Sequence, residues 1–494
     1  MKRNASDPIY ILGAGPAGLA AAYTLTQRGY PVVAIEREDR VGGLAKSFEY
    51  RDFILDCGPH RFYTKIDPVI QLWDDILGDD QVAVDRLTRI YYQGKYFSYP
   101  LKTMDTLSTL GIWESLRIIL SYSWAKLRPI RDPQNFADWV TAKFGRRLFE
   151  IFFQSYTEKL WGIPCTEISA DWASQRIKSL SLFQAMRDAL LGKNGKVHSL
   201  VDRFQYPRLG SGQLYDKIAD NLRDRGQSIL VNTEVVRLHR DRDRVTHLTL
   251  KDRQTGAEST VPCRSVISSI PMTVLLQRVL HPSPPEPIVN FARSLKFRNT
   301  ILVYLVVDRN PLFPDQWLYI NDPRVKVGRV TNFANWSPHM LPNSHQTPLC
   351  CEYWCDFGDR LWNASDEQLR DRAERELRTI QLLGNESISS GFVLKLPRVY
   401  PVYSGNYKVA LSKIQSYLQQ FENLQLIGRY GSFKYNNQDH SLLMGILAAE
   451  NVISPGTYDL WSVNSDSEYL EEIKRDRAPK YAPTTVRFSQ SASQ

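Results

Sequence analysis

The sequence lacks a long apolar run. A helix that crosses a bilayer needs about 20 consecutive apolar residues. The most apolar short stretch, residues 301–307, has only the length of one buried strand. The sequence therefore predicts no transmembrane segment. The N-terminal residues lead directly into a strand and a glycine pattern with no signal peptide before them, so we expect a cytoplasmic location.

Cysteine is scarce, with six residues among 494. This number is too low for a disulfide scaffold in a chain of this length. The closest group is Cys350, Cys351 and Cys355, in an apolar and aromatic stretch without a nearby pair of histidines. We therefore expect these residues to be buried thiols, and we predict no metal site.

Long blocks of like charge are also missing. The chain has 62 Lys and Arg against 53 Asp and Glu, a net charge of +9, and the basic residues alternate with acids, as in residues 370–376. Such mixing is typical of a solvated helix face. It makes nucleic acid the least favoured partner, and we expect none. The mild basic excess leaves open an anionic small molecule or peripheral contact with an acidic membrane surface.

The first fifty residues contain a dinucleotide-binding pattern. A strand candidate at residues 9–12 is followed by Gly13-x-Gly15-x-x-Gly18, an Ala-rich helix, and a second strand that ends at Glu36. The three glycines permit a tight turn, close approach of the backbone to a pyrophosphate, and packing of the helix on the sheet. The helix N-terminus offers N–H groups to phosphates. Because Glu36 can accept hydrogen bonds from a ribose, the pattern predicts binding of an adenine dinucleotide.

The next residues favour FAD over NAD. The segment Asp39-Arg40-Val41-Gly42-Gly43 looks like the continuation found in flavoproteins with two dinucleotide-binding domains, where paired glycines let the chain pass close to FAD. We therefore predict FAD as the cofactor. The residues expected to bind it from these two patterns are Gly13, Gly15, Ala17, Gly18, Glu36, Arg37, Gly42, Gly43 and Leu44.

Candidate strands of the cofactor domain are widely separated, near the start and near residues 230, 265 and 425. The predicted fold class is α/β (α+β overall), with a Rossmann-like FAD-binding domain assembled from separated segments and an inserted substrate domain of helices and an antiparallel sheet. The FAD-binding domain is assigned residues 1–100, 206–275 and 406–460. A helical substrate or lid region is assigned 101–205, the substrate-domain sheet and helix 276–405, and a C-terminal extension and tail 461–494.

Local patterns predict several elements. Residues 89–100 resemble a β-hairpin with its turn at Gln93-Gly94. Apolar residues recur on one helical face through residues 136–153, and residues 229–238 alternate like one strand. Ser365 and Gln368 form a capping box that opens a helix through about residue 382.

Four further patches occur in a fixed order. They are Gly58-Pro59-His60-x-Phe62-x-Thr64, the hairpin ending Phe97-Ser98-Tyr99-Pro100-Leu101, Tyr156-Thr157-x-Lys159-x-Trp161-Gly162, and Gly428-Arg429-x-Gly431-x-x-x-Tyr435-x-x-x-Asp439. Together with the FAD pattern, these patches resemble the UDP-galactopyranose mutase family, within the amine oxidase and protoporphyrinogen oxidase class of flavoproteins. The resemblance covers roughly residues 8–180 and 395–453.

The resemblance implies a reaction in which N5 of the reduced flavin attacks the anomeric carbon of a nucleotide sugar and expels UDP, with no net oxidation. It implies that Arg429 and Tyr435 bind the diphosphate, and that Tyr156 and Trp161 contact the sugar and phosphate. It places His60 beside the flavin ring. Arg176 lies near the mobile-loop arginine of the mutases, one residue out of register.

The implied catalytic residues are therefore His60, Arg429 and Arg176, and the implied substrate-binding residues are Tyr156, Trp161 and Tyr435. Further cofactor contacts are expected at His60, Val235, Gly428 and Asp439. Other interpretations stay open from the residues alone: a surface ion pair for Arg429, aromatic core packing for Tyr156 and Trp161, and a structural role for His60.

The sequence departs from the mutase pattern between residues 179 and 212. This stretch carries a longer insert, and residues 204–212 look more like the segment that precedes re-entry into the flavin domain in protoporphyrinogen oxidase-like proteins. Two functions therefore stay open. One is a mutase acting on an anionic nucleotide sugar, and the other is an FAD-dependent oxidase or desaturase with a different substrate. The sequence does not predict the oligomeric state.

Overall fold

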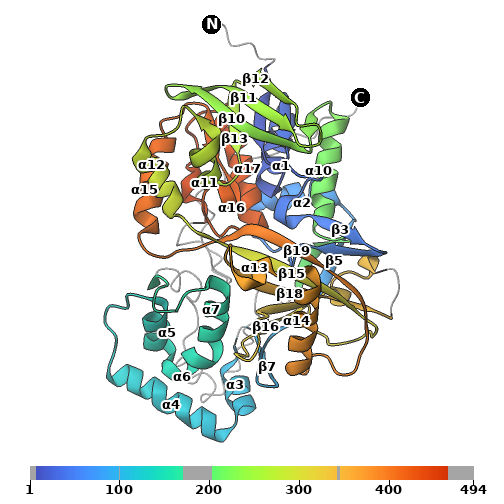
Figure 1. Cartoon of the computed structure of the whole chain (residues 1–494), viewed down its shortest axis with the longest axis vertical. Coiled ribbons are helices and arrows are strands. Elements are labelled where there is room, and N and C mark those ends of the chain that lie inside the picture. The colour runs from blue at the N-terminus through green and yellow to red at the C-terminus, as the bar shows by residue number, and fades with distance from the viewer. Residues whose placement is uncertain (1–6, 100, 171–202, 342–344, 465–494) are drawn as a thin grey trace.

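The structure is a computed structural model that describes residues 7–99, 101–170, 203–341 and 345–464. Figure 1 shows the parallel sheet and its helices at one end of the long axis, a large mixed sheet in the middle, and a group of helices at the other end. The predicted mixed α/β architecture is confirmed. Among the described helices, none combines the length and apolar composition needed to cross a membrane.

A five-stranded parallel sheet forms the base of the cofactor region. Its order is β20-β13-β1-β2-β9. The strands are β1 (Ile9–Leu12), β2 (Val32–Ile35), β9 (Ser228–Leu230), β13 (Ser265–Ser268) and β20 (Leu424–Leu426). All four pairings are parallel. Since these strands come from distant parts of the chain, the predicted assembly from separated segments is confirmed.

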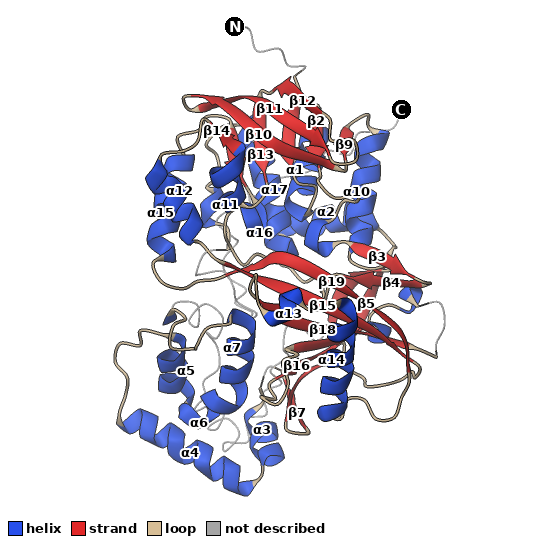
Figure 2. Cartoon of the chain, in the orientation of Figure 1, coloured by secondary structure: helices blue, strands red, loops and turns tan. Residues whose placement is uncertain are grey.

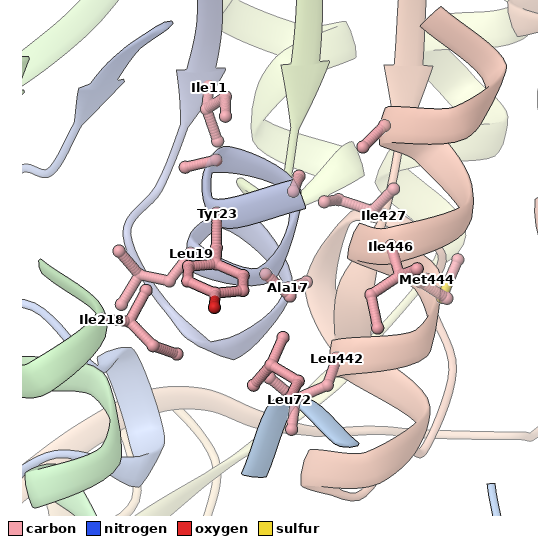
Figure 3. Packing of buried hydrophobic residues seen from close by; sticks show 14 of the residues in the cluster. Ile11, Ala17, Leu19, Tyr23, Leu72, Ile218, Ile427, Leu442, Met444 and Ile446 are labelled. Atoms are coloured by element: carbon pink, nitrogen blue, oxygen red, sulfur yellow. The ribbon is translucent and has the colours of Figure 1, made fainter. Parts of the chain in front are cut away.

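Helices and a second sheet cover the two faces of the parallel sheet. The helices on one face include α1 (Pro16–Gln27), α2 (Asp67–Leu77), α10 (Gly212–Asp224) and α17 (Gln438–Ile453). Figure 3 shows their apolar side chains meeting around α1, including Leu19, Ile218 and Leu442. The other face packs against the four-stranded sheet β12-β11-β10-β14. Its strands are β10 (Thr233–Asp241), β11 (Arg244–Asp252), β12 (Glu258–Pro262) and β14 (Leu280–His281).

Residues 229–238 form two strands and not one, so that prediction was wrong. The chain leaves the parallel sheet after β9, and Asn232 takes a left-handed conformation with φ +52°. It then enters β10 of the second sheet. Apolar side chains continue across the break, but Ile229 packs on the core under the helices, whereas Val235 and Leu238 pack in the core between the two sheets.

A seven-stranded sheet occupies the middle of the molecule (Figure 2). Its order is β19-β15-β18-β17-β16-β6-β7, and its only parallel pairing among the described strands joins β16 to β6. The strands are β6 (Thr88–Tyr92), β7 (Lys95–Ser98), β15 (Phe297–Val307), β16 (Trp317–Ile320), β17 (Arg329–Asn332), β18 (Thr347–Cys355) and β19 (Ile388–Pro401). Cys350, Cys351 and Cys355 are buried thiols of β18, as predicted.

The group of helices at the far end follows the β6–β7 hairpin. It contains α3 (Thr103–Leu110), α4 (Ile112–Leu127), α5 (Phe136–Phe144), α6 (Arg146–Phe149), a π-helical turn (Glu150–Gln154) and α7 (Ser155–Trp161). The single helix predicted over residues 136–153 is broken at Gly145, which has φ +82°. A Cβ there would lie 2.7 Å from the backbone N of Tyr122, so the break also lets α4 approach.

The remaining elements connect these layers. They are β3 (Ser47–Tyr50), β4 (Phe53–Asp56), β5 (Gln81–Asp85), β8 (Arg203–Pro207), α11 (Met272–Val274), α12 (Glu286–Ser294), α13 (Arg360–Asn363), α14 (Asp366–Thr379), α15 (Tyr407–Leu418) and α16 (Gly428–Gly431). The capping box of Ser365 and Gln368 is present at the start of α14, as predicted.

Candidate active site

Two glycine turns face each other at the N-terminus of α1. Gly13 follows β1 with φ +94°, and Gly15 caps α1 without a side-chain hydrogen bond. A Cβ on Gly43 would lie 3.2 Å from Cα of Gly15, and one on Gly18 would lie 1.9 Å from the carbonyl O of Gly13. Bare backbone and the positive end of the α1 dipole thus form a cradle that fits the pyrophosphate of a dinucleotide.

Glu36 lies at the end of β2 beside this cradle. Its Oε2 accepts a hydrogen bond from the backbone N–H of Ala14 (2.9 Å), and its Oε1 accepts one from the backbone N–H of Glu38 (3.0 Å). Burial raises the pKa of this carboxyl group. A carboxylate offers about four lone-pair sites, so Glu36 keeps acceptor capacity for the hydroxyls of a ribose. The cradle and Glu36 therefore fit FAD.

The other expected cofactor residues take different positions. Val235 lies on β10, and the backbone N–H of Thr233 at the start of that strand donates to the carbonyl O of Glu36 (2.9 Å). Leu44 packs against the apolar core of the far-end helices. The Arg37 side chain is exposed beside Glu38. Of these three, Arg37 is the one that points to solvent.

A second helix N-terminus lies next to the first. Gly428 follows β20 with φ +74°, and a Cβ there would lie 2.9 Å from Cβ of Ala17. Asp439 lies in the first turn of α17. Gln438 of the same turn donates from Nε2 to the backbone O of His60 (3.2 Å). The α17 turn therefore connects the cradle to the Gly58–His60 segment.

The Gly58–His60 segment is anchored by Asp56 at the end of β4. The buried carboxylate of Asp56 accepts hydrogen bonds from Ser47 Oγ (2.5 Å), from the Ser211 backbone N–H (3.0 Å) and from the Tyr206 hydroxyl. Burial raises the pKa of Asp56 to about 7 in spite of these donors. The Tyr304 hydroxyl donates to the Asp56 backbone O (2.5 Å). These bonds fix the strand end from which His60 projects.

His60 is a neutral imidazole with one nitrogen free to accept. Its Nδ1 lies 3.0 Å from the backbone O of Gly58, and because a carbonyl only accepts, Nδ1 carries the proton. Burial, together with the positive charges of Arg329 and Arg429, lowers the pKa of His60 to about 4. At neutral pH Nε2 is therefore an acceptor.

Arg429, on α16, is held by carbonyl groups and aromatic rings. Its Nε donates to the backbone O of Val399 (2.7 Å), and its Nη1 donates to the backbone O of Asn436 (3.1 Å). The guanidinium lies 4.3 Å from the ring centre of Tyr435 and 4.8 Å from that of Tyr400. Within the described parts of the chain it makes no ion pair with a carboxylate. Its charge therefore remains available to an anion.

Tyr156 and Trp161 lie on the same helix but in different surroundings. Tyr156 packs edge-to-face on Tyr319 (5.3 Å) and Trp354 (5.4 Å), and burial raises the pKa of its hydroxyl well above the usual value. Trp161 ends α7 and is buried near Tyr400. Trp161 is thus more deeply buried than Tyr156, whose hydroxyl stays protonated. Arg176 lies outside the described residues.

The sequence patterns missed a charged pair in the same place. Arg329 on β17 binds Glu352 on β18 through two parallel hydrogen bonds, Nε to Oε1 (2.5 Å) and Nη2 to Oε2 (2.6 Å). A Cβ on Gly58 would lie 3.5 Å from Oε1 of Glu352. The charge of Arg329 acts on His60 and on Tyr156. The sequence signal that could have indicated this pair is Glu352, a lone acid inside the apolar stretch 350–355.

These side chains form one group between the cofactor region and the middle sheet. We call it the junction cluster: His60, Tyr156, Arg329, Glu352, Tyr400, Arg429 and Tyr435. The Tyr400 and Tyr435 rings stack at 5.4 Å, which joins β19 to the α16–α17 segment. The cluster offers one neutral acceptor, the guanidinium of Arg429, the Arg329–Glu352 ion pair and three phenol hydroxyls. Such a set can bind an anionic, hydroxyl-rich molecule.

Comparison with known proteins places the chain among flavoproteins. A family model for flavin containing amine oxidoreductase matches residues 16–453. A probable UDP-galactopyranose mutase from Klebsiella pneumoniae is 30% identical over 173 residues, covering 33% of this chain and 43% of that protein. The chain thus matches less than half the length of this relative.

Solved structures share the fold over most of their length. Reduced UDP-galactopyranose mutase superposes with a TM-score of 0.80 at 21% identity, covering 93% of this chain and 97% of that one. A putative protoporphyrinogen oxidase from Exiguobacterium superposes with a TM-score of 0.68 at 18% identity, covering 90% of this chain and 98% of that one. Because the family model spans most of the chain, this protein belongs to the flavin-containing amine oxidoreductase family and is an FAD-dependent enzyme.

Proposed function

We propose that this enzyme acts on a nucleotide-activated sugar and interconverts its pyranose and furanose forms, or carries out a closely related reaction. The observation that carries the proposal is Arg429, a guanidinium with carbonyl and aromatic neighbours and no carboxylate partner in the described chain. The planar donor fork of a guanidinium matches the oxygens of a phosphate, so a diphosphate fits this position. The likeness to a protein named probable UDP-galactopyranose mutase supports the same class of substrate.

The proposed roles follow from the cluster geometry. The chemistry that bound, reduced FAD supplies in such a reaction is nucleophilic attack by N5 on the anomeric carbon. Arg429 binds the diphosphate leaving group, assisted by the hydroxyl of Tyr435. Nε2 of His60 accepts a hydrogen bond from a sugar or flavin N–H or O–H group, because its Nδ1 is already committed to Gly58. Tyr156 donates to the substrate, and the surrounding rings exclude water.

The cofactor contacts are part of the same proposal. We assign the pyrophosphate to the backbone at Gly13, Gly15, Ala17 and Gly43, the ribose to Glu36, and the flavin side to Gly428 and Asp439. The glycine cradle supports the first assignment because side chains are excluded there.

Arg429→Ala tests the proposal. Loss of a charge-assisted fork to a phosphate is expected to lower kcat/KM by about 100-fold or more, since such pairs contribute about 2–5 kcal/mol. FAD should stay bound, as judged from the visible spectrum of the purified protein. The matched control is Arg244→Ala, a surface arginine paired with Glu422 (3.2 Å). Wild-type turnover in Arg429→Ala would count against the proposed substrate class.

The second candidate is an FAD-dependent oxidase or desaturase. The likeness to a putative protoporphyrinogen oxidase favours it, as does the family to which the chain belongs. The two functions differ in their electron balance. If the enzyme interconverts the pyranose and furanose forms, anaerobic incubation of the chemically reduced enzyme with UDP-galactose isomers should yield isomerised sugar. Substrate-dependent oxygen consumption by the oxidised enzyme, without added reductant, would establish the second.

A further inference from the structure

Helix α4 presents its apolar side to solvent. Seven large apolar residues of this helix have exposed fractions from 38% to 82%, whereas Ile118 is 1% exposed. We call these seven the α4 face: Ile112, Trp113, Leu116, Ile119, Leu120, Trp124 and Leu127. At 100° per residue they fall within one arc of about 140°. A surface helix normally turns such a stripe toward the core, so α4 has the reverse orientation.

The α4 face is an outer edge of the molecule. Figure 1 shows α4 at the end of the long axis opposite the parallel sheet, with the other far-end helices on one side of it. Two further exposed apolar residues are close in the sequence, Met104 of α3 (62% exposed) and Ile130 after the helix (38% exposed). Contiguous exposed apolar surface of this kind marks a contact site.

Basic residues line both edges of the α4 face. On the helical wheel Arg117 lies at one edge and Lys126 at the other, and the exposed Arg128 and Arg131 follow. Arg128 stacks on Trp124 at 4.5 Å. Glu114 is the one acidic residue of α4. It is turned away from the α4 face, where it pairs with Arg147 and also with Arg117 (3.4 Å).

The combination selects one kind of partner. Tryptophan and leucine on one face with lysine and arginine at its edges is typical of helices that lie in the interface of an anionic bilayer. Pairing of two copies across a two-fold axis would bring Lys126, Arg128 and Arg131 of one copy near the same residues of the second. The acid of α4, Glu114, would not compensate them because it is already shared by Arg117 and Arg147. We propose that α4 docks this enzyme, as a peripheral protein, on membrane surfaces that contain anionic lipid.

Flotation of the FAD-loaded enzyme with lipid vesicles tests this docking. The wild type should float with vesicles of phosphatidylcholine and phosphatidylglycerol, and less with phosphatidylcholine alone. The variant Ile112→Gln, Trp113→Gln and Leu127→Gln changes the three most exposed residues of the α4 face. It should partition at least about tenfold more weakly. The control Phe357→Gln with Val409→Gln changes two exposed apolar residues elsewhere and should bind like the wild type.

The basic edge is tested separately. Arg128→Ala with Arg131→Ala should weaken binding about fivefold per charge, and should reduce its dependence on salt. Flavin absorbance and thermal unfolding verify that each variant is folded. The proposal is overturned if the wild type does not float with anionic vesicles, or if the triple variant floats as well as the wild type. It is also overturned if sedimentation shows that the triple substitution only converts a dimer to a monomer, with no lipid binding by either form.

Discussion

At the scale of single residues, the members of the junction cluster differ in whether an opposite charge neutralises them. Arg329 is neutralised by Glu352 through two short hydrogen bonds, and His60 is held neutral. Arg429 has only carbonyl and aromatic partners among the described residues. Positive charge without an acidic partner at a partly buried position raises the local concentration of anions. The net charge of the cluster therefore comes mainly from Arg429.

Asp56 gives the enzyme a pH-dependent stability that one substitution can isolate. The folded-state pKa of about 7 lies above the ordinary value of 3.8, so the folded state prefers the protonated acid. The stabilisation is fully present below pH ~4 and is lost as the pH rises toward 7. The free energy of unfolding of the wild type relative to Asp56→Asn should fall by up to about 3 kcal/mol between pH 5 and pH 7.

Urea unfolding of both proteins at the two pH values measures this difference. Asp220→Asn, which changes an exposed acid of α10, is the matched control and should show no such trend. A constant difference between the wild type and Asp56→Asn from pH 5 to pH 7 would mean that Asp56 titrates below this range in the folded protein.

Single residues also show how far sequence reasoning reaches. His60 and Arg429 are recognisable because their neighbours in the chain, Gly58 and Gly428, complete a motif. Arg329 and Glu352 have no motif of their own, and they meet only because β17 and β18 pair in the register that sets them opposite each other. Register depends on packing of the whole sheet, which a single strand does not encode.

At the scale of elements, the predictions that are confirmed concern features determined by a few adjacent residues. The capping box of α14 and the β6–β7 hairpin depend on a few adjacent residues, and both are confirmed. Periodicity correctly indicated the buried face of residues 136–153 but missed the break at Gly145. That break depends on the approach of α4, which comes from another part of the chain.

The cradle depends on close packing between helices α1 and α17. A Cβ on Gly445 of α17 would lie 2.2 Å from the backbone O of Ala17 and 2.9 Å from Cβ of Ala20. Gly445→Ala should therefore push the helices apart at the first turns of α1, and lower the free energy of unfolding by about 1–3 kcal/mol. FAD occupancy, measured as the ratio of flavin to protein absorbance, should fall. Ser454→Ala at the C-terminal end of α17 should leave the ratio unchanged.

At the scale of the whole molecule, the cofactor cradle is assembled from segments that lie far apart in the sequence. Its parallel sheet combines β1 and β2 with β9, β13 and β20, and Gly428 at the start of α16 lies against Ala17 of α1, although the two are near opposite ends of the described chain. The fingerprint in the first fifty residues identifies one half of this site. The other half follows from topology, because a ligand binds at the carboxyl ends of parallel strands wherever these lie in the sequence.

Removal of FAD should for this reason loosen distant parts of the chain together. A ligand present at about 100 times its dissociation constant stabilises the folded state by about 2.7 kcal/mol, so the apoenzyme should unfold at correspondingly lower urea. Limited proteolysis followed by mass spectrometry should show that cleavage increases both around Gly42–Gly43 and around Gly428, while β15, buried in the middle sheet, stays protected in both forms. Increased cleavage confined to the N-terminal segment would contradict a cradle shared by α1 and α16. Re-addition of FAD should restore protection of both segments at the same concentration, because one ligand closes both halves.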